Sequence, residues 1–270
     1  MTRRIQSIAE IAADYDAVVF DQWGVLHNGA APYGNAIECL ASLPRPAAVL
    51  SNSGKRAAPN AERIRAMGFE VPFHTVMTSG EALWRDIDRG LVPARRFHPV
   101  ERAEGDAAHW AAGLDIELTS LAEAEAILLM GLPDGSALEG WRPFLTAALA
   151  RGLPLYCSNP DRKSPRKDGF VLSPGALAFA YQDMGGTVSF YGKPHRPIFD
   201  SLARAMGTSK LLMVGDSLEH DIAGAATAGW DSVLVGSGLY AAAFRDAPWQ
   251  EALSVLAPDH APTFFIGEVQ

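Results

Sequence analysis

Short apolar runs alternate with helical patterns through most of this 270-residue chain. Such runs are typical of strands buried on both faces, and the segments between them carry the mixed pattern of amphipathic helices. The alternation predicts an α/β fold with a parallel sheet. The predicted strands span residues 17–20, 47–50, 126–130, 153–157, 187–191, 211–214, 232–235 and 263–266, and the predicted helices span 34–43, 58–67, 81–89, 137–150, 175–184, 197–206 and 218–228, with a further amphipathic helix over 5–15.

Two of these strands end in an aspartate. Asp21 follows the run 17–20, and Asp216 follows the run 211–214 after one glycine. Open parallel sheets bind ligands outside the carboxyl ends of their strands. Two carboxylates that meet there repel one another unless a cation lies between them. The pair therefore indicates magnesium-dependent phosphoryl transfer, although Asp21 alone fits an ordinary turn aspartate equally well.

Three further segments offer groups for the same chemistry. Ser51, followed by Asn52 and Ser53, places hydroxyl and backbone N–H groups near a helix start, which suits a phosphate; a plain helix cap is the alternative. Lys193 follows a strand end and offers an ammonium for the phosphoryl group, or is a solvated surface lysine. Asp221 lies five positions after Asp216, so both carboxylates can reach one hard cation; favourable charge at a helix start is the alternative.

Together and in this order, these residues resemble the motifs of the haloacid dehalogenase (HAD) superfamily. The stretches Ser51-Asn52, Asn159-Pro160-Asp161, Pro174-Gly175 and Gly192-Lys193-Pro194 further resemble its class IIA, the NagD-type and 4-nitrophenylphosphatase-like hydrolases. The resemblance implies a Rossmann-like parallel-sheet core over residues 1–78 and 186–270, with an inserted α/β class II cap over 79–185.

The resemblance also implies roles. Asp21 attacks phosphorus and forms an aspartyl-phosphate, which water then hydrolyses. Asp21, Asp216, Asp221 and the backbone carbonyl of Trp23 hold Mg²⁺, and Ser51 and Lys193 grip the phosphate. In the cap, Asn159 and Asp161 are expected to contact the substrate, although an ordinary turn explains them as well.

Trp23 departs from the family pattern. That position is commonly an aspartate, which protonates the leaving group and later activates water. Indole has one N–H donor and does not titrate, and loss of a positioned acid–base group typically costs ~10²–10⁴-fold in rate. Three outcomes follow: only good leaving groups react; His27, His195 or His220 substitutes; or the chain binds phosphorylated ligands with little catalysis.

The leading prediction is thus a magnesium-dependent phosphatase of a small phosphorylated metabolite. Its alternative is a catalytically weak HAD-fold protein that binds phosphorylated ligands or a protein partner. The net charge of −8 argues against nucleic acid as a partner. No apolar run is long enough for a membrane span, and Cys39 and Cys157 are too few for a disulfide framework, which favours a reduced, cytoplasmic location. A homodimer formed through the cap is compatible with the sequence.

Overall fold

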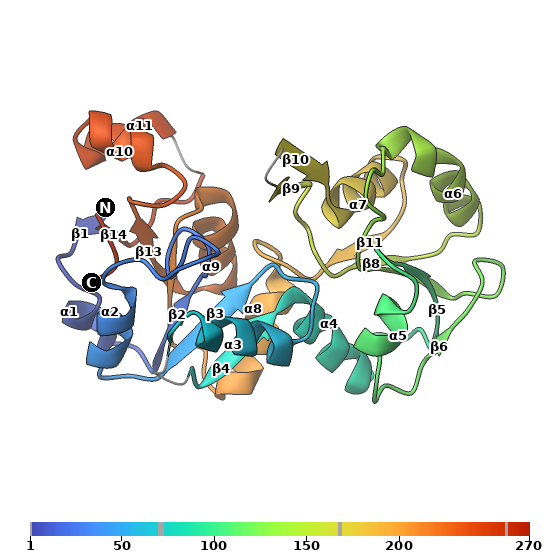
Figure 1. Ribbon diagram of the computed structural model, residues 1–270, viewed down its shortest axis with the longest axis horizontal. Helices are drawn as coiled ribbons and strands as arrows, with labels where there is room; N and C mark the ends of the chain where they lie inside the picture. Colours follow the sequence, from blue (N-terminus) through green and yellow to red (C-terminus); the bar gives the residue numbers. More distant parts are fainter. Residues whose placement is uncertain (1, 70–72, 167–168, 257–258) are drawn as a thin grey trace. The chain divides into compact units, whose positions relative to one another are not determined.

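The computed structural model of the protein describes residues 2–69, 73–166, 169–256 and 259–270. The chain divides into two compact units (Figure 1). Unit 1 comprises Met1–Ser51, Ala57–Met77 and Lys193–Gln270, and unit 2 comprises Asn52–Arg56 and Thr78–Gly192. The core and cap boundaries predicted from the sequence stay predictions beside these units.

Unit 1 is built on a seven-stranded sheet in the order β1-β14-β13-β12-β2-β3-β4. The pairings from β1 to β3 are all parallel. Every residue of the central strands β2 and β12 is buried, which explains their uninterrupted apolar sequences. The strands are β1 (Arg3–Arg4), β2 (Ala17–Phe20), β3 (Ala47–Ser51), β4 (Thr75–Thr78), β12 (Leu211–Gly215), β13 (Asp231–Val235) and β14 (Phe264–Ile266).

Helix α8 (Arg196–Met206) shows the usual boundary signals of a helix. In α8, Pro197 stands in the first turn, Gly207 ends the helix in the left-handed conformation, and Ile198, Phe199 and Leu202 form its buried face. The helices are α1 (Ala9–Ala12), α2 (Ala36–Ser42), α3 (Ala57–Ala66), α8 (Arg196–Met206), the π-turn η1 (Leu218–Ile222), α9 (Ala223–Ala228), α10 (Ala241–Asp246) and α11 (Trp249–Leu256).

Unit 2 has its own five-stranded sheet, in the order β11-β8-β7-β5-β6 with parallel pairings. Its hydrophobic core gathers residues of β7, β8, α6 and α7, among them Ile127, Leu155 and Tyr181. The strands are β5 (Arg96–Val100), β6 (Glu117–Leu118), β7 (Ala126–Leu129), β8 (Leu155–Cys157) and β11 (Val188–Phe190), with the antiparallel pair β9 (Lys163–Arg166) and β10 (Gly169–Leu172); the helices are α4 (Ser79–Asp88), α5 (Asp106–Trp110), α6 (Leu138–Ala150) and α7 (Pro174–Asp183).

The structure confirms all the predicted strands and most of the predicted helices, with boundaries shifted by at most a few residues. One helix prediction is wrong. Residues 5–15 do not form one long helix. Only Ala9–Ala12 is helical, because the backbone N–H groups of Ile5 and Ile8 donate to the carbonyl oxygens of Phe265 (3.0 Å) and Gln270 (2.9 Å). The predicted helix 218–228 divides into η1 and α9.

Cys39 and Cys157 are both buried and free, with no disulfide between them. No helix in the described part of the chain has the length and hydropathy needed to cross a membrane.

Candidate active site

The predicted site residues of unit 1 gather at the carboxyl ends of three adjacent parallel strands. Asp21 directly follows β2, Asp216 follows β12 on one side of it, and Ser51 ends β3 on the other side. Register fixes this arrangement, because Phe20 lies opposite both Val214 and Val49. The strand order therefore brings together residues that are almost 200 positions apart in sequence.

Three carboxylates form the centre of the site. Asp21, Asp216 and Asp221 each offer an oxygen, and these oxygens lie within 4.8 Å of one another. Asp221 belongs to η1, whose start is capped by the Ser217 side chain, which accepts a hydrogen bond from the backbone N–H of His220. Lys193 enters the same cluster: its Nζ donates to Asp21 Oδ1 at 2.6 Å and to Asp221 Oδ1 at 2.7 Å.

Asp221 and Asp216 differ in how many of their carboxylate oxygens accept hydrogen bonds from the protein. Asp221 Oδ2 accepts from the backbone N–H groups of Asp216 (3.1 Å) and Ser217 (3.0 Å), so both of its oxygens are held. Asp216 Oδ2 accepts from the backbone N–H of Leu239 at 2.8 Å. Among the residues described, no hydrogen bond reaches Asp216 Oδ1, which leaves that oxygen open to a cation.

The carboxyl groups are costly to ionise together. Burial and the neighbouring carboxylates of Asp21 and Asp221 raise the pKa of Asp216 to about 7. Burial also raises the pKa of Asp21 to about 6, although Lys193 opposes the shift. Burial by itself lowers the pKa of the Lys193 ammonium, but Asp21 and Asp221 raise it above its ordinary value, so Lys193 is charged. One buried cation thus only partly balances three acids.

This donor set fits a small, hard divalent cation. Carboxylate oxygens are the ligands that Mg²⁺ prefers, and Mg²⁺ is commonly bound by one or two carboxylates with waters and substrate phosphates. Asp216 has an open oxygen, and mutual repulsion among the carboxylates disfavours the metal-free ionised state. Asp21 and Asp216 are therefore the residues best placed to hold Mg²⁺, with Asp221 orienting Lys193 and the 216–217 backbone.

Stabilisation by Mg²⁺ is expected to increase with pH. Because the pKa values of Asp21 and Asp216 are raised above that of an unfolded aspartate, their contribution to stability is full below about pH 4 and is lost as the pH rises through about 6 and 7. Mg²⁺ binds the ionised carboxylates, so it relieves a repulsion that exists only at the higher pH. Thermal unfolding with and without Mg²⁺ at pH 5.5 and 8, at matched ionic strength, should give the larger shift at pH 8. Equal shifts of the unfolding temperature at the two pH values would contradict this prediction.

The backbones of two glycines lie directly against the Asp216 carboxylate, and the sequence did not predict this contact. Gly24 has φ +80°, and a Cβ on it would lie 1.8 Å from Asp216 Oδ2. A Cβ on Gly238 would lie 2.3 Å from the same oxygen. The segment Gly236–Gly238 follows β13, which pairs with β12, so the sheet order brings it beside Asp216.

Gly24→Ala is expected to weaken Mg²⁺ binding by about 10–100-fold, the range seen when groups that orient metal ligands are changed. The added methyl group would displace the Asp216 carboxylate. Gly207→Ala is the matched control, because Gly207 also has a positive φ (+70°) but a Cβ there meets nothing within 4 Å. Both variants carry backbone strain of about 1–2 kcal/mol, so calorimetric Mg²⁺ titration separates strain from displacement. Equal affinities in the two variants would contradict the placement of Gly24.

Trp23 and His27 meet in the loop after β2, but with opposite exposures. The Trp23 side chain is 52% exposed, whereas His27 is fully buried. His27 Nδ1 accepts from the backbone N–H of Gly29 at 3.0 Å, and burial lowers the His27 pKa to about 4. A neutral, buried imidazole that accepts a hydrogen bond from a loop N–H fits a structural role, and His27 as the replacement acid–base group stays a prediction.

The other two histidines stay predictions as proton-transfer groups. His195 precedes α8 and His220 lies in η1. Burial and the charge of His220 lower the pKa of His195, so the two interact with each other.

Four predicted substrate contacts belong to unit 2: Asn52, Ser53, Asn159 and Asp161. The structure does bring part of this set together. Asn52 Nδ2 donates to Asp161 Oδ1 at 2.9 Å, and the Asp161 backbone N–H donates to Asn159 Oδ1 at 2.9 Å. Their contact with a substrate stays a prediction.

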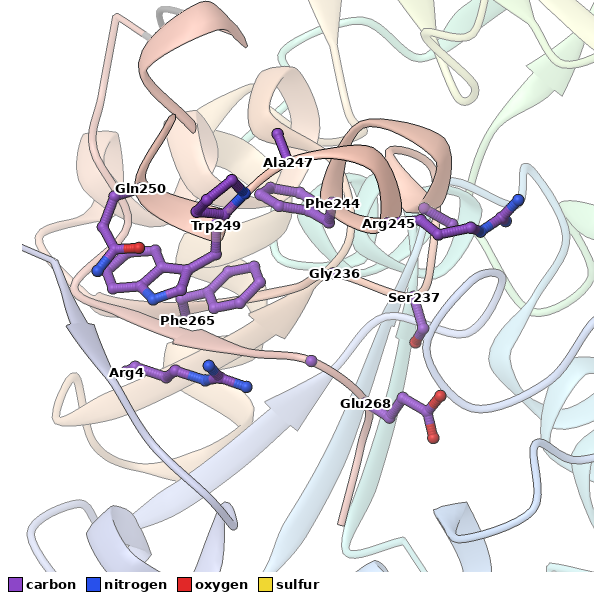
Figure 2. A pocket seen from close by; sticks show the side chains of 13 residues that line it. Arg4, Gly236, Ser237, Phe244, Arg245, Ala247, Trp249, Gln250, Phe265 and Glu268 are labelled. Atoms are coloured by element: carbon purple, nitrogen blue, oxygen red, sulfur yellow. The ribbon is translucent and has the colours of Figure 1, made fainter. Parts of the chain in front are cut away.

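A cavity of about 770 Å³ lies elsewhere in unit 1, around α10, α11 and β14 (Figure 2). The Trp249 ring stacks on Phe265, with centroids 5.1 Å apart and 8° between the planes. None of the predicted site residues lines this cavity. The two places are joined through one loop, because Ser237 lines the cavity and the Leu239 N–H holds Asp216.

Two sequence-family models match the chain. The model described as haloacid dehalogenase-like hydrolase matches residues 18–96, and the HAD-hydrolase-like model matches residues 190–266. These segments contain Asp21, Ser51, Lys193, Asp216 and Asp221. The two matched segments together therefore contain every residue of the carboxylate cluster.

Known proteins resemble the chain over most of its length. It is 29% identical to a glycerol-3-phosphate phosphatase from Homo sapiens, over 85% of this chain and 81% of the relative. It is 28% identical to a D-glycerol 3-phosphate phosphatase from Mycobacterium tuberculosis, over 86% of this chain and 66% of the relative.

Solved structures share the fold. A haloacid dehalogenase-like hydrolase from Brucella suis superposes with a TM-score of 0.78 at 28% identity, over 98% of this chain and all of the other. A glycerol phosphate phosphatase from Mycobacterium tuberculosis, solved in complex with magnesium, superposes with a TM-score of 0.75 at 22% identity, over 98% of this chain and 78% of the other.

Proposed function

Since this chain belongs to class IIA of the haloacid dehalogenase superfamily and is a phosphoric monoester hydrolase, we propose that it hydrolyses a small phosphorylated metabolite through an aspartyl-phosphate on Asp21. One observation carries the proposal. The Asp21 carboxylate stands at a strand tip within 4.8 Å of Asp216 and Asp221 and is held by the buried Lys193. A carboxylate nucleophile beside an ammonium group suits an anion that must be bound and attacked, and Mg²⁺ would offset the repulsion from the other carboxylates.

Asp21 and Lys193 do the chemical work of the first step. Lys193 binds Asp21 Oδ1 and so fixes the direction of the carboxylate. It also places a full positive charge where a phosphoryl group approaches, and it lowers the Asp21 pKa in part against the larger, opposite effect of burial. Asp221 in turn fixes Lys193 through Oδ1 and the 216–217 backbone through Oδ2.

The metal in this proposal is Mg²⁺, held by Asp21, Asp216 and the backbone carbonyl of Trp23, with Asp221 as a further predicted ligand. When bound, Mg²⁺ neutralises charge that develops on the transferring phosphoryl group. The phosphate contacts of Ser51, Asn52 and Ser53 stay predictions, as do the homodimer and the cytoplasmic location.

Trp23 limits what this site can hydrolyse. Its indole takes the place of the usual acid–base aspartate and has no proton to give at any ordinary pH. The first step therefore depends on leaving groups that depart without protonation. The same feature supports the alternative function, a protein that binds phosphorylated ligands and turns them over slowly.

Phosphate release separates the two functions. The wild-type protein is assayed with 4-nitrophenyl phosphate and a panel of phosphorylated metabolites that includes glycerol 3-phosphate, with Mg²⁺ or with a chelator. Release that requires Mg²⁺ supports the phosphatase. Thermal stabilisation by the same ligands without release would instead support the binder.

A further inference from the structure

Two large aromatic side chains stand exposed on the loop that follows β2. Trp23 is 52% exposed and Tyr33 is 38% exposed. Burial stabilises an aromatic side chain. Aromatic rings that stay exposed in one loop beside a catalytic centre therefore indicate a surface that a ligand covers. These rings raise the question of which part of a substrate they meet.

The Trp23 ring is fixed in place although half of it is exposed. Gly29 has φ +94°, and a Cβ there would lie 2.3 Å from Cη2 and from Cζ2 of the indole, so the ring edge rests directly on the Gly29 backbone. The buried His27 meets the indole edge to face, with centroids 6.0 Å apart, and its Nδ1 accepts from the Gly29 N–H. Arg63 Nη2 donates to the Gly29 carbonyl oxygen at 3.1 Å. A ring held in this way loses little entropy when it binds a ligand.

Both aromatic residues belong to the loop that runs from Asp21 past the carboxylate cluster. Trp23 lies between Asp21 and Gly24 in the chain, and the Gly24 backbone abuts Asp216. Isolated β-bridges pair Trp23 with His27 and His27 with Pro32, and the Tyr33 N–H donates to the Leu26 carbonyl oxygen at 2.9 Å, so the chain that carries Tyr33 folds back along the segment that carries Trp23. The nucleophile and the two exposed rings thus belong to the one loop that connects β2 with α2.

We propose that Trp23 and Tyr33 form an aromatic wall for the leaving group, and that the site selects aryl phosphates, the monoesters of planar and weakly basic alcohols. This rests on the proposed phosphatase function. Two separate features point to this class: the aromatic faces stack on a planar group, and the missing acid demands a leaving group that is stable as an anion. A phenol, with a pKa near 10 as in tyrosine, meets that demand far better than an alkyl alcohol.

The chemistry balances without an enzyme acid. An Asp21 oxygen bonds to phosphorus while the bond from phosphorus to the aryl oxygen breaks, and the electron pair leaves with the aryloxide. Water then attacks the phosphorus of the aspartyl-phosphate and displaces the Asp21 carboxylate. The water supplies one hydroxyl to the phosphate, and its remaining proton reaches the aryloxide through solvent.

Two phosphonates test the wall without turnover. Phenylphosphonate and methylphosphonate present the same anion with and without a planar group, and neither is hydrolysed at its P–C bond by this chemistry. In calorimetric titrations with Mg²⁺, wild type should bind phenylphosphonate about 10-fold more tightly than methylphosphonate, the scale of one aromatic contact. Trp23→Leu should bring this ratio to within about 2-fold, whereas Trp23→Phe should keep most of it, because Phe retains a stacking face.

Phe170→Leu is the matched control, since Phe170 is an exposed aromatic side chain of unit 2 (74% exposed) outside this loop. It should leave the ratio unchanged. Tyr33→Leu should also lower the ratio of phenylphosphonate to methylphosphonate affinity, and this second test does not depend on the folding of a Trp23 variant. An unchanged ratio in Trp23→Leu and Tyr33→Leu would overturn the wall.

Turnover distinguishes the failure of this inference from the failure of the phosphatase. The aromatic wall is contradicted, and the phosphatase function stands, if esters are hydrolysed with Mg²⁺ but Trp23→Leu changes kcat/KM equally for aryl and alkyl phosphates. The phosphatase function is contradicted, and the aromatic wall stands, if no ester is hydrolysed while the ratio of the affinities for phenylphosphonate and methylphosphonate still depends on Trp23.

Discussion

Asp21→Asn is expected to abolish magnesium-dependent phosphate release, with a fall of at least ~10⁴-fold, the scale of losing a covalent nucleophile. An amide oxygen is a poor nucleophile, yet asparagine has almost the shape of aspartate, so β2 and the loop after it are kept. Lys193 retains its second partner, Asp221, at 2.7 Å. Phosphate release is measured under single-turnover and steady-state conditions against wild type.

The same variant should be more heat-stable than wild type at pH 8 in the presence of a chelator. The Asp21 pKa is raised to about 6, so its ionised form at pH 8 opposes folding, and asparagine removes that charge from the carboxylate cluster. Asp134→Asn is the control, because the Asp134 side chain is 78% exposed. Lost activity with unchanged or lower stability would contradict the repulsion assigned to the cluster, and retained activity would mean that the nucleophile lies elsewhere.

The strands that carry this chemistry were predictable from sequence because they are buried on both faces. Ala17–Phe20 and Leu211–Gly215 are uninterrupted apolar runs, and parallel order alone then brings Asp21 and Asp216 to one edge. Strand β5 was missed because its sequence, Arg-Phe-His-Pro-Val, contains a charged residue and a proline. It became a strand through pairing with β7, which is a long-range effect.

The surroundings of the carboxylates were less predictable. The contact of Gly24 with Asp216 depends on a left-handed glycine, and the hydrogen bond from Leu239 depends on how the chain leaves β13. His27 illustrates the same limit: the fold of residues 22–33 buries it with its ring edge to face against Trp23, which its sequence position does not indicate. Loop conformation, which has no periodic signature in sequence, decides these roles.

Trp23→Asp is expected to raise kcat/KM for an alkyl phosphate such as glycerol 3-phosphate by about 10²–10⁴-fold, the typical contribution of a positioned acid. The new carboxyl would stand beside Asp21 and near Asp216, whose pKa values are already raised to about 6 and about 7 by burial and mutual repulsion. Repulsion from these two neighbouring carboxylates should raise the pKa of the aspartate in Trp23→Asp and favour its protonated form, which a general acid requires.

The gain should be small for 4-nitrophenyl phosphate, because its leaving group needs little protonation, so the ratio of aryl to alkyl kcat/KM should fall. The gain should also fade as the pH rises through the pKa of the new acid, since only the protonated form donates. Trp23→Asn is the matched control: it removes the indole equally but has no acidic proton, and it should show no gain. If Trp23→Asn gains as much, relief of crowding and not proton transfer explains the effect. If neither variant gains while Mg²⁺ binding is intact, the missing acid is not what limits this site.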